Sequence, residues 1–452
     1  MGQNFRKPIG ESFGSSQFKS NRLRRNFGRG RGGGGGGPRR GGFGISKSSR
    51  IDELMFINKA SEKNHILDYV SKHKFSDFKI GELLKQNILK KKFNKPMAIQ
   101  DQTIPEILRG KDLIGLADTG TGKTAAFLIP FIDKISKDKN QKVLIVAPTR
   151  ELALQINSEF MDFARGLNIY SVAVVGGAGI SEQIYQIRRG LNALIGTPGR
   201  LKDLANRKII NLNMFQNVVL DEADRMLDMG FIVDIKFLLK QLPKERQTIF
   251  FAATLSKEIE NLTKDFSNNP IKIETKIRNT SSNVEQDIIK ISPSESKIGI
   301  LENLLVKEDF KKVLIFAKTK TGVENLADDL RDKGFKVDSI HGDKSQSSRQ
   351  RSLKSFKENR VEILVATDVA ARGLDIPEVT HVINYDIPNT YDDYIHRIGR
   401  TGRAHKKGIA ITFIGGKSHH YGSRSIGEKP KIFNERKSFR SGYSRKLSRN
   451  YK

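Results

Sequence analysis

Between residues 75 and 415, short apolar runs end in small or polar residues and alternate with segments of helical periodicity. The runs are continuous and rich in β-branched residues, which is typical of strands buried on both faces. Alternation of such strands with helices predicts parallel sheets with crossover helices, in which ligands bind at the carboxyl ends of the strands. The runs are VLIVAPT (143–149), NALIGTP (192–198), NVVLDEAD (217–224), TIFFAAT (248–254), KVLIFAKT (312–319), EILVATD (362–368) and HVINYD (381–386).

Breaks in this pattern predict an α/β protein with two domains in tandem. The stretch NNPIKIETKIRNTSSN (268–283) has a proline near its start and ends in polar residues, so we expect a linker between two domains there, assigned to 276–283. The first domain then covers 75–275 and the second 284–415. Residues 51–74 are interpreted as a helical lead-in of unknown role.

The two ends of the chain are predicted to be disordered basic tails. The net charge is +30, from 80 basic and 50 acidic residues, and residues 1–50 alone hold twelve basic residues and one acidic residue. Residues 416–452 are similarly rich in Lys, Arg and Ser, and the glycine run within 28–44 has too little apolar surface to order itself. Phenylalanines among the arginines favour contact with nucleic acid over a purely solubilising tail.

Composition also bounds the cellular setting. The chain has no cysteine, which excludes disulfides and thiolate zinc sites and fits a reducing compartment. No apolar run has the length of a membrane span, and the N-terminus lacks the apolar segment of a secretory signal. We therefore expect a cytoplasmic protein without a membrane partner.

A phosphate-binding loop is predicted in LIGLADTGTGKT (113–124), where an apolar strand leads through glycines into a helix. Backbone amides of such a loop cradle phosphates. Lys123 is expected to reach the β- and γ-phosphates, and the Thr124 hydroxyl to bind Mg²⁺. The general pattern begins with Gly where this chain has Ala117, and a glycine turn without a ligand is the alternative. The predicted nucleotide-binding residues of the loop are Thr119, Gly120, Thr121, Gly122, Lys123 and Thr124.

Two further segments complete this interpretation. DEAD (221–224) follows a buried strand, where Asp221 is expected to hold Mg²⁺ and Glu222 to accept the proton of the attacking water; a solvated turn is the alternative. HRIGRTGR (396–403) carries three arginines, which indicate either a basic helix face or an arginine finger supplied by the second domain.

In their order along 75–415, these motifs resemble those of the DEAD-box RNA helicases. The resemblance implies two RecA-like domains, ATP and Mg²⁺ as cofactors, and ATP hydrolysis coupled to local unwinding or remodelling of RNA duplexes and ribonucleoprotein complexes. It rests on FNKPMAIQ (93–100), ADTGTGKT (117–124), PTREL (148–152), GG (176–177), TPGR (197–200), DEAD (221–224), AAT (252–254), ARGLD (371–375) and HRIGRTGR (396–403).

The resemblance also implies roles around the nucleotide. Gln100 would read the adenine edge, with Phe75 stacked on the base and Phe93 beside it. Further expected roles are Asp375 at the ribose, Arg400 and Arg403 at the γ-phosphate, and interdomain coupling by Asp224, Ala252, Thr254 and His396.

The RNA residues are implied in the same way, as contacts to phosphates and sugars without sequence readout. Contact with the 2′-hydroxyl would select RNA over DNA, while a turn or cap role is the alternative for each Thr or Gly. They are Thr149, Arg150, Gly177, Thr197, Gly199, Arg200, Thr319, Gln346, Arg349, Thr367 and Arg372.

Three positions depart from the family pattern. Lys92 stands where Gly is usual, Met97 where Thr or Ser is usual, and Ala252 replaces the serine of the motif that links ATP use to unwinding. Ala252 leaves two readings open: weakened coupling, or a packing choice to which its neighbours are adapted. Two rival functions stay open: an ATP-gated RNA clamp with little unwinding, which Ala252 and the tails favour, and a DNA helicase of related architecture, against which FNKPMAIQ and DEAD argue.

Overall fold

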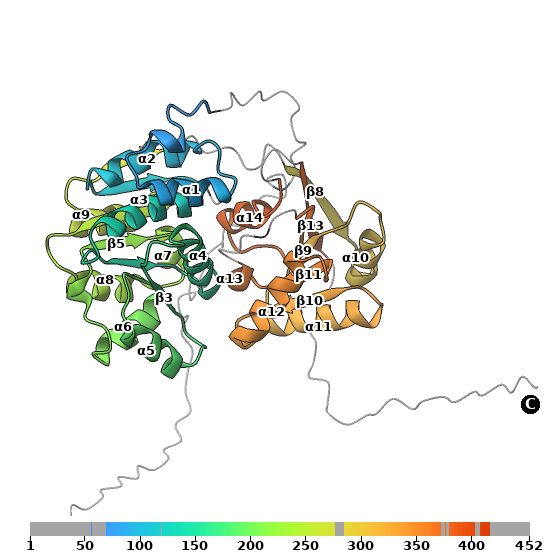
Figure 1. Cartoon of the computed structure of the whole chain (residues 1–452). Helices are drawn as coiled ribbons and strands as arrows, with labels where there is room; N and C mark the ends of the chain where they lie inside the picture. Colours follow the sequence, from blue (N-terminus) through green and yellow to red (C-terminus); the bar gives the residue numbers. More distant parts are fainter. Residues whose placement is uncertain are drawn as a thin grey trace, which may run out of the picture. The chain divides into compact units, whose positions relative to one another are not determined.

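The computed structural model describes residues 56, 69–118, 120–275, 284–371, 376, 379–402 and 407–415. The predicted tails, 1–50 and 416–452, and the predicted linker, 276–283, lie outside these residues. Two parallel sheets organise the described part (Figure 1), and the two predicted α/β domains are thereby confirmed.

The first sheet has seven strands in the order β3-β4-β2-β5-β6-β1-β7, and every neighbouring pair is parallel. Five of the predicted strands lie in this sheet, including the one that precedes the phosphate loop. The strands are β1 (Leu113–Leu116), β2 (Val143–Val146), β3 (Ser171–Val174), β4 (Ala193–Gly196), β5 (Asn217–Leu220), β6 (Gln247–Ala252) and β7 (Ile271–Glu274).

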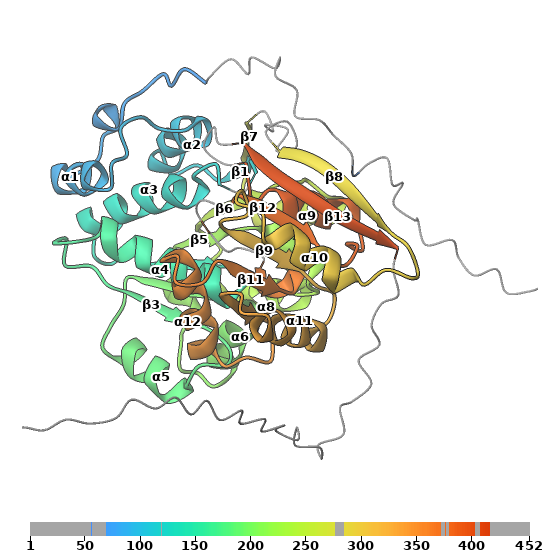
Figure 2. The same cartoon turned by 90° about the vertical axis from the view of Figure 1, so that its right-hand side faces the viewer.

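Helices cover both faces of this sheet, which explains the continuous apolar runs. Val143 and Ile145 of β2 face the cluster that includes α2, α3 and α4, whereas Leu144 and Val146 face the cluster that includes α6, α8 and α9. In Figures 1 and 2, α2 lies beside α3. The helical elements are η2 (Phe75–Asp77), α1 (Glu82–Lys90), α2 (Ala98–Leu108), α3 (Lys123–Lys137), α4 (Arg150–Phe163), α5 (Ile180–Arg188), α6 (Pro198–Asn206), η3 (Leu212–Met214), α7 (Ala223–Asp228), α8 (Ile232–Gln241) and α9 (Lys257–Phe266).

The second sheet has six parallel strands in the order β10-β11-β9-β12-β13-β8. Its edge strand β8 lies beside β13 in both views of the chain (Figures 1 and 2). The elements are β8 (Val284–Ile291), α10 (Lys297–Leu305), β9 (Val313–Phe316), α11 (Lys320–Asp332), β10 (Val337–Ile340), α12 (Gln346–Lys357), β11 (Ile363–Ala366), α13 (Asp368–Ala371), β12 (His381–Asn384), α14 (Tyr391–Ile398) and β13 (Gly408–Gly415).

Two expectations need correction. The stretch 268–283 is not a linker throughout, because β7 lies within it and pairs with β1 at the edge of the first sheet. The lead-in 51–74 is not helical over residues 69–74, which carry no regular structure. Asp101 provides the physical reason, because Tyr69, Lys72 and His73 all bond to its carboxylate and thereby hold this stretch against α2 without helical hydrogen bonds.

Candidate ATP site and RNA interface

The strand order of the first sheet sorts the predicted residues into two halves. The phosphate loop follows β1, the DEAD segment follows β5, and Ala252 is the last residue of β6; these three strands are neighbours. The segments that contain Thr149, Gly177 and Thr197 follow β2, β3 and β4, which are also neighbours. Because all strands are parallel, both groups lie along one edge of the sheet, with the predicted nucleotide residues in one half, called the nucleotide half, and the predicted RNA residues in the other, called the RNA half.

The phosphate loop is built on left-handed glycines and a folded-back lysine. Gly120 and Gly122 have φ of 82° and 86°, a conformation that glycine adopts without the steric cost of a Cβ atom. The Lys123 ammonium is buried and donates to the Ala117 carbonyl at 2.9 Å. Ala117 fits its position because it continues the β1 ladder, donating its N–H to the Ala252 carbonyl at 3.0 Å. The lysine ammonium therefore lies inside the loop that is predicted to bind the nucleotide phosphates.

Gln100 connects the first turn of α2 to the phosphate loop. Its side-chain oxygen accepts from the Met97 N–H at 2.9 Å, and its amide nitrogen donates to the Gly122 carbonyl at 3.0 Å. A Cβ atom at Gly122 would overlap the Gln100 amide and approach the Met97 sulfur to 3.0 Å. Met97 thus packs over the loop at the position where the family has a hydroxyl, and adenine contact by Gln100 stays a prediction.

The aromatic residues predicted beside the base form part of the core. Phe75 is only 3% exposed and packs against Phe78 and Phe93 with ring centroids 5.9 and 6.2 Å apart. Stacking of Phe75 on adenine stays a prediction. Nearby, Lys92 has φ of 61°, a left-handed conformation that explains why the family favours glycine there.

The carboxylates of the site are buried, with Lys123 near Asp221 and Arg225 paired with Glu222. Burial raises the pKa of Asp221 to about 7; Lys123 opposes this rise, while Glu222 and Asp224 add to it. Burial also raises the pKa of Asp118, and its Oδ2 has no hydrogen-bond partner. A buried carboxylate of this kind is stabilised in its charged form by a divalent cation, so the donor set of Asp221 and Thr124 fits Mg²⁺.

Glu222 occupies a strained position directly after the strand. It has φ of 52° and ψ of 51° at the start of α7, and such non-glycine outliers concentrate at functional sites. The residue is 5% exposed, and its carboxylate pairs with Arg225 Nη1 at 3.2 Å. Arg225, itself buried, was not predicted from the sequence; its position one turn after Glu222 is the signal that would have identified it.

Asp224 joins the DEAD segment to the end of β6. Its Oδ2 accepts from the backbone N–H groups of Ala253 and Thr254 at 2.7 and 2.9 Å, and the Thr254 hydroxyl lies 3.5 Å away. The Ala252 methyl group is fully buried in the core on the α7–α9 side of the sheet. Backbone amides therefore make the principal contact to Asp224, and this contact does not depend on a hydroxyl at position 252.

The RNA half of the first sheet is built from helix starts and a close glycine turn. Thr149 caps α4 by accepting from the Leu152 N–H at 3.3 Å, and Thr197 precedes α6, whose first turn contains Gly199. Gly177 has φ of 74°, and a Cβ atom there would overlap the Arg150 guanidinium.

Arg200, in the same half, is held in place by protein groups. Its Nη1 donates to Gln183 Oε1 at 3.0 Å, and both Nη atoms approach the Ala178 carbonyl. Burial lowers the pKa of its guanidinium. Arg200 thus supports the loop that follows β3, and its contact with RNA stays a prediction.

In the second sheet the predicted RNA residues follow the adjacent strands β9, β10 and β11. Thr319 caps α11 by accepting from the Gly322 N–H at 3.0 Å. Gln346 and Arg349 in α12 are buried and donate to Glu151 of α4, at 3.3 and 2.7 Å. Glu151 was not among the predicted site residues, although it lies in the PTREL motif. The RNA role of Gln346, Arg349 and Thr367 stays a prediction.

The arginines of HRIGRTGR have different environments. Arg397 is a structural residue, because its guanidinium is buried, bonds to Asp368 at 2.5 and 2.7 Å and lies over the Phe316 ring. Arg400 is also buried, at the end of the segment that begins with α14, and His396 is half-buried on that helix. Thr119, Arg372, Asp375 and Arg403 lie outside the described residues.

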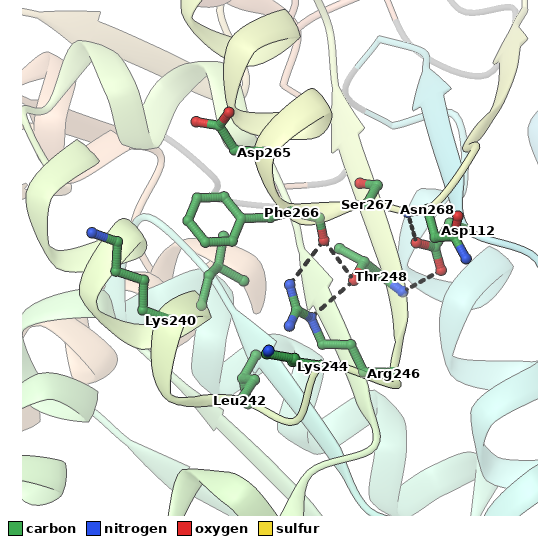
Figure 3. A pocket seen from close by; sticks show the side chains of 11 residues that line it. Asp112, Lys240, Leu242, Lys244, Arg246, Thr248, Asp265, Phe266, Ser267 and Asn268 are labelled. Carbon is green, nitrogen blue, oxygen red and sulfur yellow. Dashed lines mark hydrogen bonds between the residues drawn. The ribbon is translucent and has the colours of Figure 1, made fainter.

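A cavity of about 310 Å³ lies at the opposite, amino end of the first sheet (Figure 3). Asp112, which bonds to the backbone N–H groups of Thr248 and Asn268, and Arg246 line it. The Arg246 guanidinium donates to Thr248 Oγ1 and to the carbonyls of Pro243 and Phe266, at 3.1, 2.8 and 2.8 Å. These groups are committed to protein partners, so the cavity is a structural feature away from the candidate site.

Among the described residues, no cluster of three or more metal-ligating side chains is present, and no helix has the length and apolar character needed to cross a bilayer.

Comparison with known proteins agrees with this geometry. The DEAD/DEAH box helicase family model matches residues 97–262, and the helicase conserved C-terminal domain model matches residues 296–405. The ATP-dependent RNA helicase CshA of Listeria monocytogenes is 45% identical over 343 residues, covering 75% of this chain and 66% of that protein. The DEAD-box ATP-dependent RNA helicase CshA of Bacillus subtilis is 43% identical over 342 residues, covering 75% of this chain and 69% of that protein. The chain thus spans about two thirds of the length of these curated relatives.

Solved structures show the same fold. S. cerevisiae Dbp5 bound to RNA and ADP BeF3 has a TM-score of 0.68 at 31% identity, covering 76% of this chain and 90% of that chain. Mss116p, with its NTE and C-tail deleted and bound to ssRNA and AMP-PNP, has a TM-score of 0.68 at 32% identity. The match covers 75% of this chain and 73% of that chain. On the strength of its sheets, its motif geometry and these relatives, the chain belongs to the DEAD-box family of ATP-dependent RNA helicases.

Proposed function

We propose that this protein hydrolyses ATP in order to grip RNA and separate short RNA duplexes. The observation that carries the proposal is the division of the first sheet, in which nucleotide motifs follow β1, β5 and β6 and RNA motifs follow β2, β3 and β4. Asp224 links the two activities, since it joins the hydrolytic segment to the loop after β6.

The hydrolytic chemistry is assigned to residues of the buried half. Lys123 leaves the Ala117 carbonyl to bind the β- and γ-phosphates, and Glu222 accepts a proton from the attacking water. Arg225 holds the Glu222 carboxylate in position through their 3.2 Å pair. Asp221 and Thr124 would hold Mg²⁺, which neutralises charge that develops on the phosphates. Arg400 and Arg403 of the second domain complete the site when the domains close.

RNA is held through its phosphates and sugars by the other half of the sheet and by the second domain. Helix starts after Thr149 and Thr197 offer backbone N–H groups, which suit phosphate contact without base readout. ATP and RNA together favour closure, the bound strand bends, a few base pairs open, and hydrolysis resets the clamp. Recognition of the 2′-hydroxyl makes RNA the preferred partner.

The proposed setting is the cytoplasm, with structured RNA and ribonucleoprotein complexes as partners. The cysteine-free sequence supports a reducing compartment, and the basic ends of the chain support general affinity for RNA.

The test compares ATP hydrolysis with a single-stranded RNA, with DNA of the same sequence and with no nucleic acid. We expect RNA alone to stimulate hydrolysis, and a short RNA duplex to be released only with hydrolysable ATP. Equal stimulation by DNA would favour the DNA helicase reading. ATP-dependent RNA binding without duplex release would favour the RNA clamp. The contacts of Asp224 do not support that alternative, because its bonds to the backbone amides of Ala253 and Thr254 do not need a hydroxyl at position 252.

A further inference from the structure

Asp101 is a buried carboxylate in the first turn of α2, directly after Gln100. The residue is 2% exposed, and its backbone N–H donates to the Met97 carbonyl at 2.9 Å as part of the helix. A buried carboxylate is costly unless its oxygens accept hydrogen bonds. The groups that bond to these oxygens therefore show which part of the chain Asp101 holds.

Four polar groups converge on the Asp101 carboxylate, and all belong to residues 69–73, called here the anchored stretch. The Tyr69 hydroxyl and the Lys72 N–H donate to Oδ2 at 2.6 and 2.7 Å. His73 contacts Oδ1 through its backbone N–H at 3.2 Å and through Nδ1 at 2.6 Å. Although burial opposes the change, the bonds from Tyr69, His73 and Lys72 lower the pKa of Asp101. The carboxylate is therefore ionised at neutral pH and holds the anchored stretch against α2.

The anchored stretch leads directly into the aromatic residue that is predicted to stack on the base. Phe75 follows His73 by two residues and begins η2. The His73 ring lies against Phe78 with centroids 5.7 Å apart, and the Phe78 ring meets Phe75 edge to face at 5.9 Å. A shift of His73 would thus reach Phe75 both along the chain and through the intervening ring.

The other neighbour of Asp101 is the residue that is predicted to read the adenine edge. The Gln100 amide is oriented by its bonds to the Met97 N–H and the Gly122 carbonyl, which use one acceptor site and one donor of the group. Its second acceptor site and second donor match the N6 amino group and N7 of adenine, whereas guanine offers two acceptors there. Stacking accepts any base, so selection of adenine depends on how far the stacked base lies from this amide.

We propose that Asp101 is a positioning residue for nucleotide selection, which sets the distance between Phe75 and Gln100 by fixing the anchored stretch to α2. Its own oxygens are committed to the anchored stretch, so it acts through these two residues and does not contact the base. The inference rests on the proposed function, because it takes Phe75 and Gln100 as the residues that bind the adenine of ATP.

The first test is Asp101→Asn in the full chain, with the equilibrium binding of ATP and GTP measured by displacement of a fluorescent ADP. The amide keeps the shape of the carboxylate, but its NH₂ group faces donors of the anchored stretch and cannot accept from them. We expect the preference for ATP over GTP to fall by about tenfold, because the contacts that distinguish adenine are lost while stacking on either base persists.

Hydrolysis gives a second readout that separates positioning from damage to the fold. In Asp101→Asn the KM for ATP should rise by about tenfold, while the rate at saturating ATP and RNA stays within about twofold, because Lys123 and Glu222 are unchanged. Partial unfolding would instead lower the saturated rate with ATP and with GTP by the same factor and leave both KM values in place. That outcome would overturn the proposal.

Tyr69→Phe is a milder variant, since it removes one hydroxyl from the Asp101 carboxylate and keeps the ring. We expect the preference for ATP to fall by about threefold, less than in Asp101→Asn, because three of the four contacts persist. If Asp101→Asn does not fold, Tyr69→Phe decides alone. An unchanged preference in every variant that folds would refute the role of Asp101.

Asp112→Asn is the matched control for loss of a buried carboxylate. Asp112 is 7% exposed and accepts from the backbone N–H groups of Thr248 and Asn268, at 2.8 and 2.7 Å, beside the cavity at the amino end of the sheet. The control should lower the melting temperature but leave the preference for ATP unchanged. If Asp112→Asn and Asp101→Asn reduce that preference equally, the effect belongs to general loosening of the domain, and the proposal is wrong.

The binding measurement needs neither RNA nor hydrolysis, so it separates this inference from the proposed function. Absence of RNA-stimulated hydrolysis in the parent chain would refute the proposed function and leave a loss of ATP preference in Asp101→Asn as support for the anchor. RNA-stimulated hydrolysis in the parent, with the same ATP preference in parent and Asp101→Asn, would refute the anchor alone. A parent chain that binds ATP and GTP equally would also overturn the anchor, since there would be no selection for Asp101 to support.

Discussion

The two halves of the first sheet hold their functional residues in contrasting ways. In the nucleotide half, Lys123, Asp221 and Glu222 are all buried, and burial raises the pKa of Asp221 to about 7. In the RNA half, Thr149 acts as a helix cap and Gly177 occupies an exposed left-handed turn. The nucleotide half therefore combines buried charge with its backbone conformation, whereas the described contacts of the RNA half depend mainly on backbone conformation.

This difference explains why the halves should respond differently to mutation. Buried ionised groups depend on each other, so loss of one leaves its neighbours with uncompensated charge. Helix starts and turns present backbone N–H groups, which persist when a side chain changes. We expect single substitutions to abolish hydrolysis in the nucleotide half and to weaken RNA affinity gradually in the RNA half.

Glu222→Gln should give the largest effect. The amide keeps the shape of the side chain but cannot accept the proton of the attacking water, so single-turnover hydrolysis with RNA present should fall by ~10²–10⁴. RNA affinity with a non-hydrolysable ATP analogue should be retained.

The matched control is Glu260→Gln, at an exposed position of α9, which should leave hydrolysis unchanged. A Glu222→Gln rate within about twofold of the parent would remove Glu222 from the general-base role, since the loss of such a base costs ~10²–10⁴.

Asp224→Asn should uncouple the two halves. Asp224 accepts two charge-assisted bonds from the amides of Ala253 and Thr254, and such bonds contribute about 1.5–3 kcal/mol each, against about 1 kcal/mol for neutral ones. We expect about a tenfold drop in strands separated per ATP hydrolysed, with ATP affinity nearly constant. Asp265→Asn, also on an exposed position of α9, is the control; a parallel fall in both variants would contradict the coupling role.

Gly177→Ala should weaken RNA binding and leave the rate of ATP hydrolysis at saturating RNA unchanged. The left-handed conformation costs an L-residue about 1–2 kcal/mol, and the added methyl group would displace Arg150, so RNA affinity should fall by about 5- to 30-fold. Gly179→Ala is the control, because Gly179 has φ of −55° and nothing lies within 4 Å of its Cβ position. Fluorescence anisotropy with labelled RNA measures both; equal affinities in the two variants would contradict the role of the turn.

Ala252→Ser should give the smallest effect. The methyl group is fully buried in the core, and the contact to Asp224 is made by the amides of Ala253 and Thr254. A new hydroxyl would be buried, so we expect a stability loss of about 1–3 kcal/mol if it is unpaired. The ratio of unwinding to hydrolysis on a short duplex should stay within about twofold. A several-fold rise of that ratio would instead support the hypothesis that Ala252 weakens the coupling of ATP hydrolysis to unwinding.

The sequence predicted the strands well because these depend on local pattern. Continuous apolar runs such as 217–220 become strands because helices cover both faces. Contacts between residues far apart in the sequence could not be predicted in this way. The partnership of Glu151 with Arg349 and the burial of Phe56 against Tyr394 join segments far apart in sequence, and no local pattern encodes them.

Two local features were also missed for physical reasons. β7 lies in the stretch 268–283, whose proline and polar residues predict a linker, and as an edge strand it has only Ile273 buried. Arg397 belongs to the same motif as Arg400, yet it is a structural residue because Asp368 lies beside it. The spacing of charges within a motif does not distinguish an arginine that packs from one that reaches a ligand.

The most direct test of the division between the halves is ATP hydrolysis measured against RNA concentration for Glu222→Gln and Gly177→Ala beside the parent. The structure predicts a crossed pattern: Glu222→Gln loses the saturated rate but binds RNA normally, whereas Gly177→Ala keeps the saturated rate and needs more RNA to reach it. If the saturated rate and the RNA affinity fall together in both variants, the two halves do not act separately, and this account of the site is contradicted.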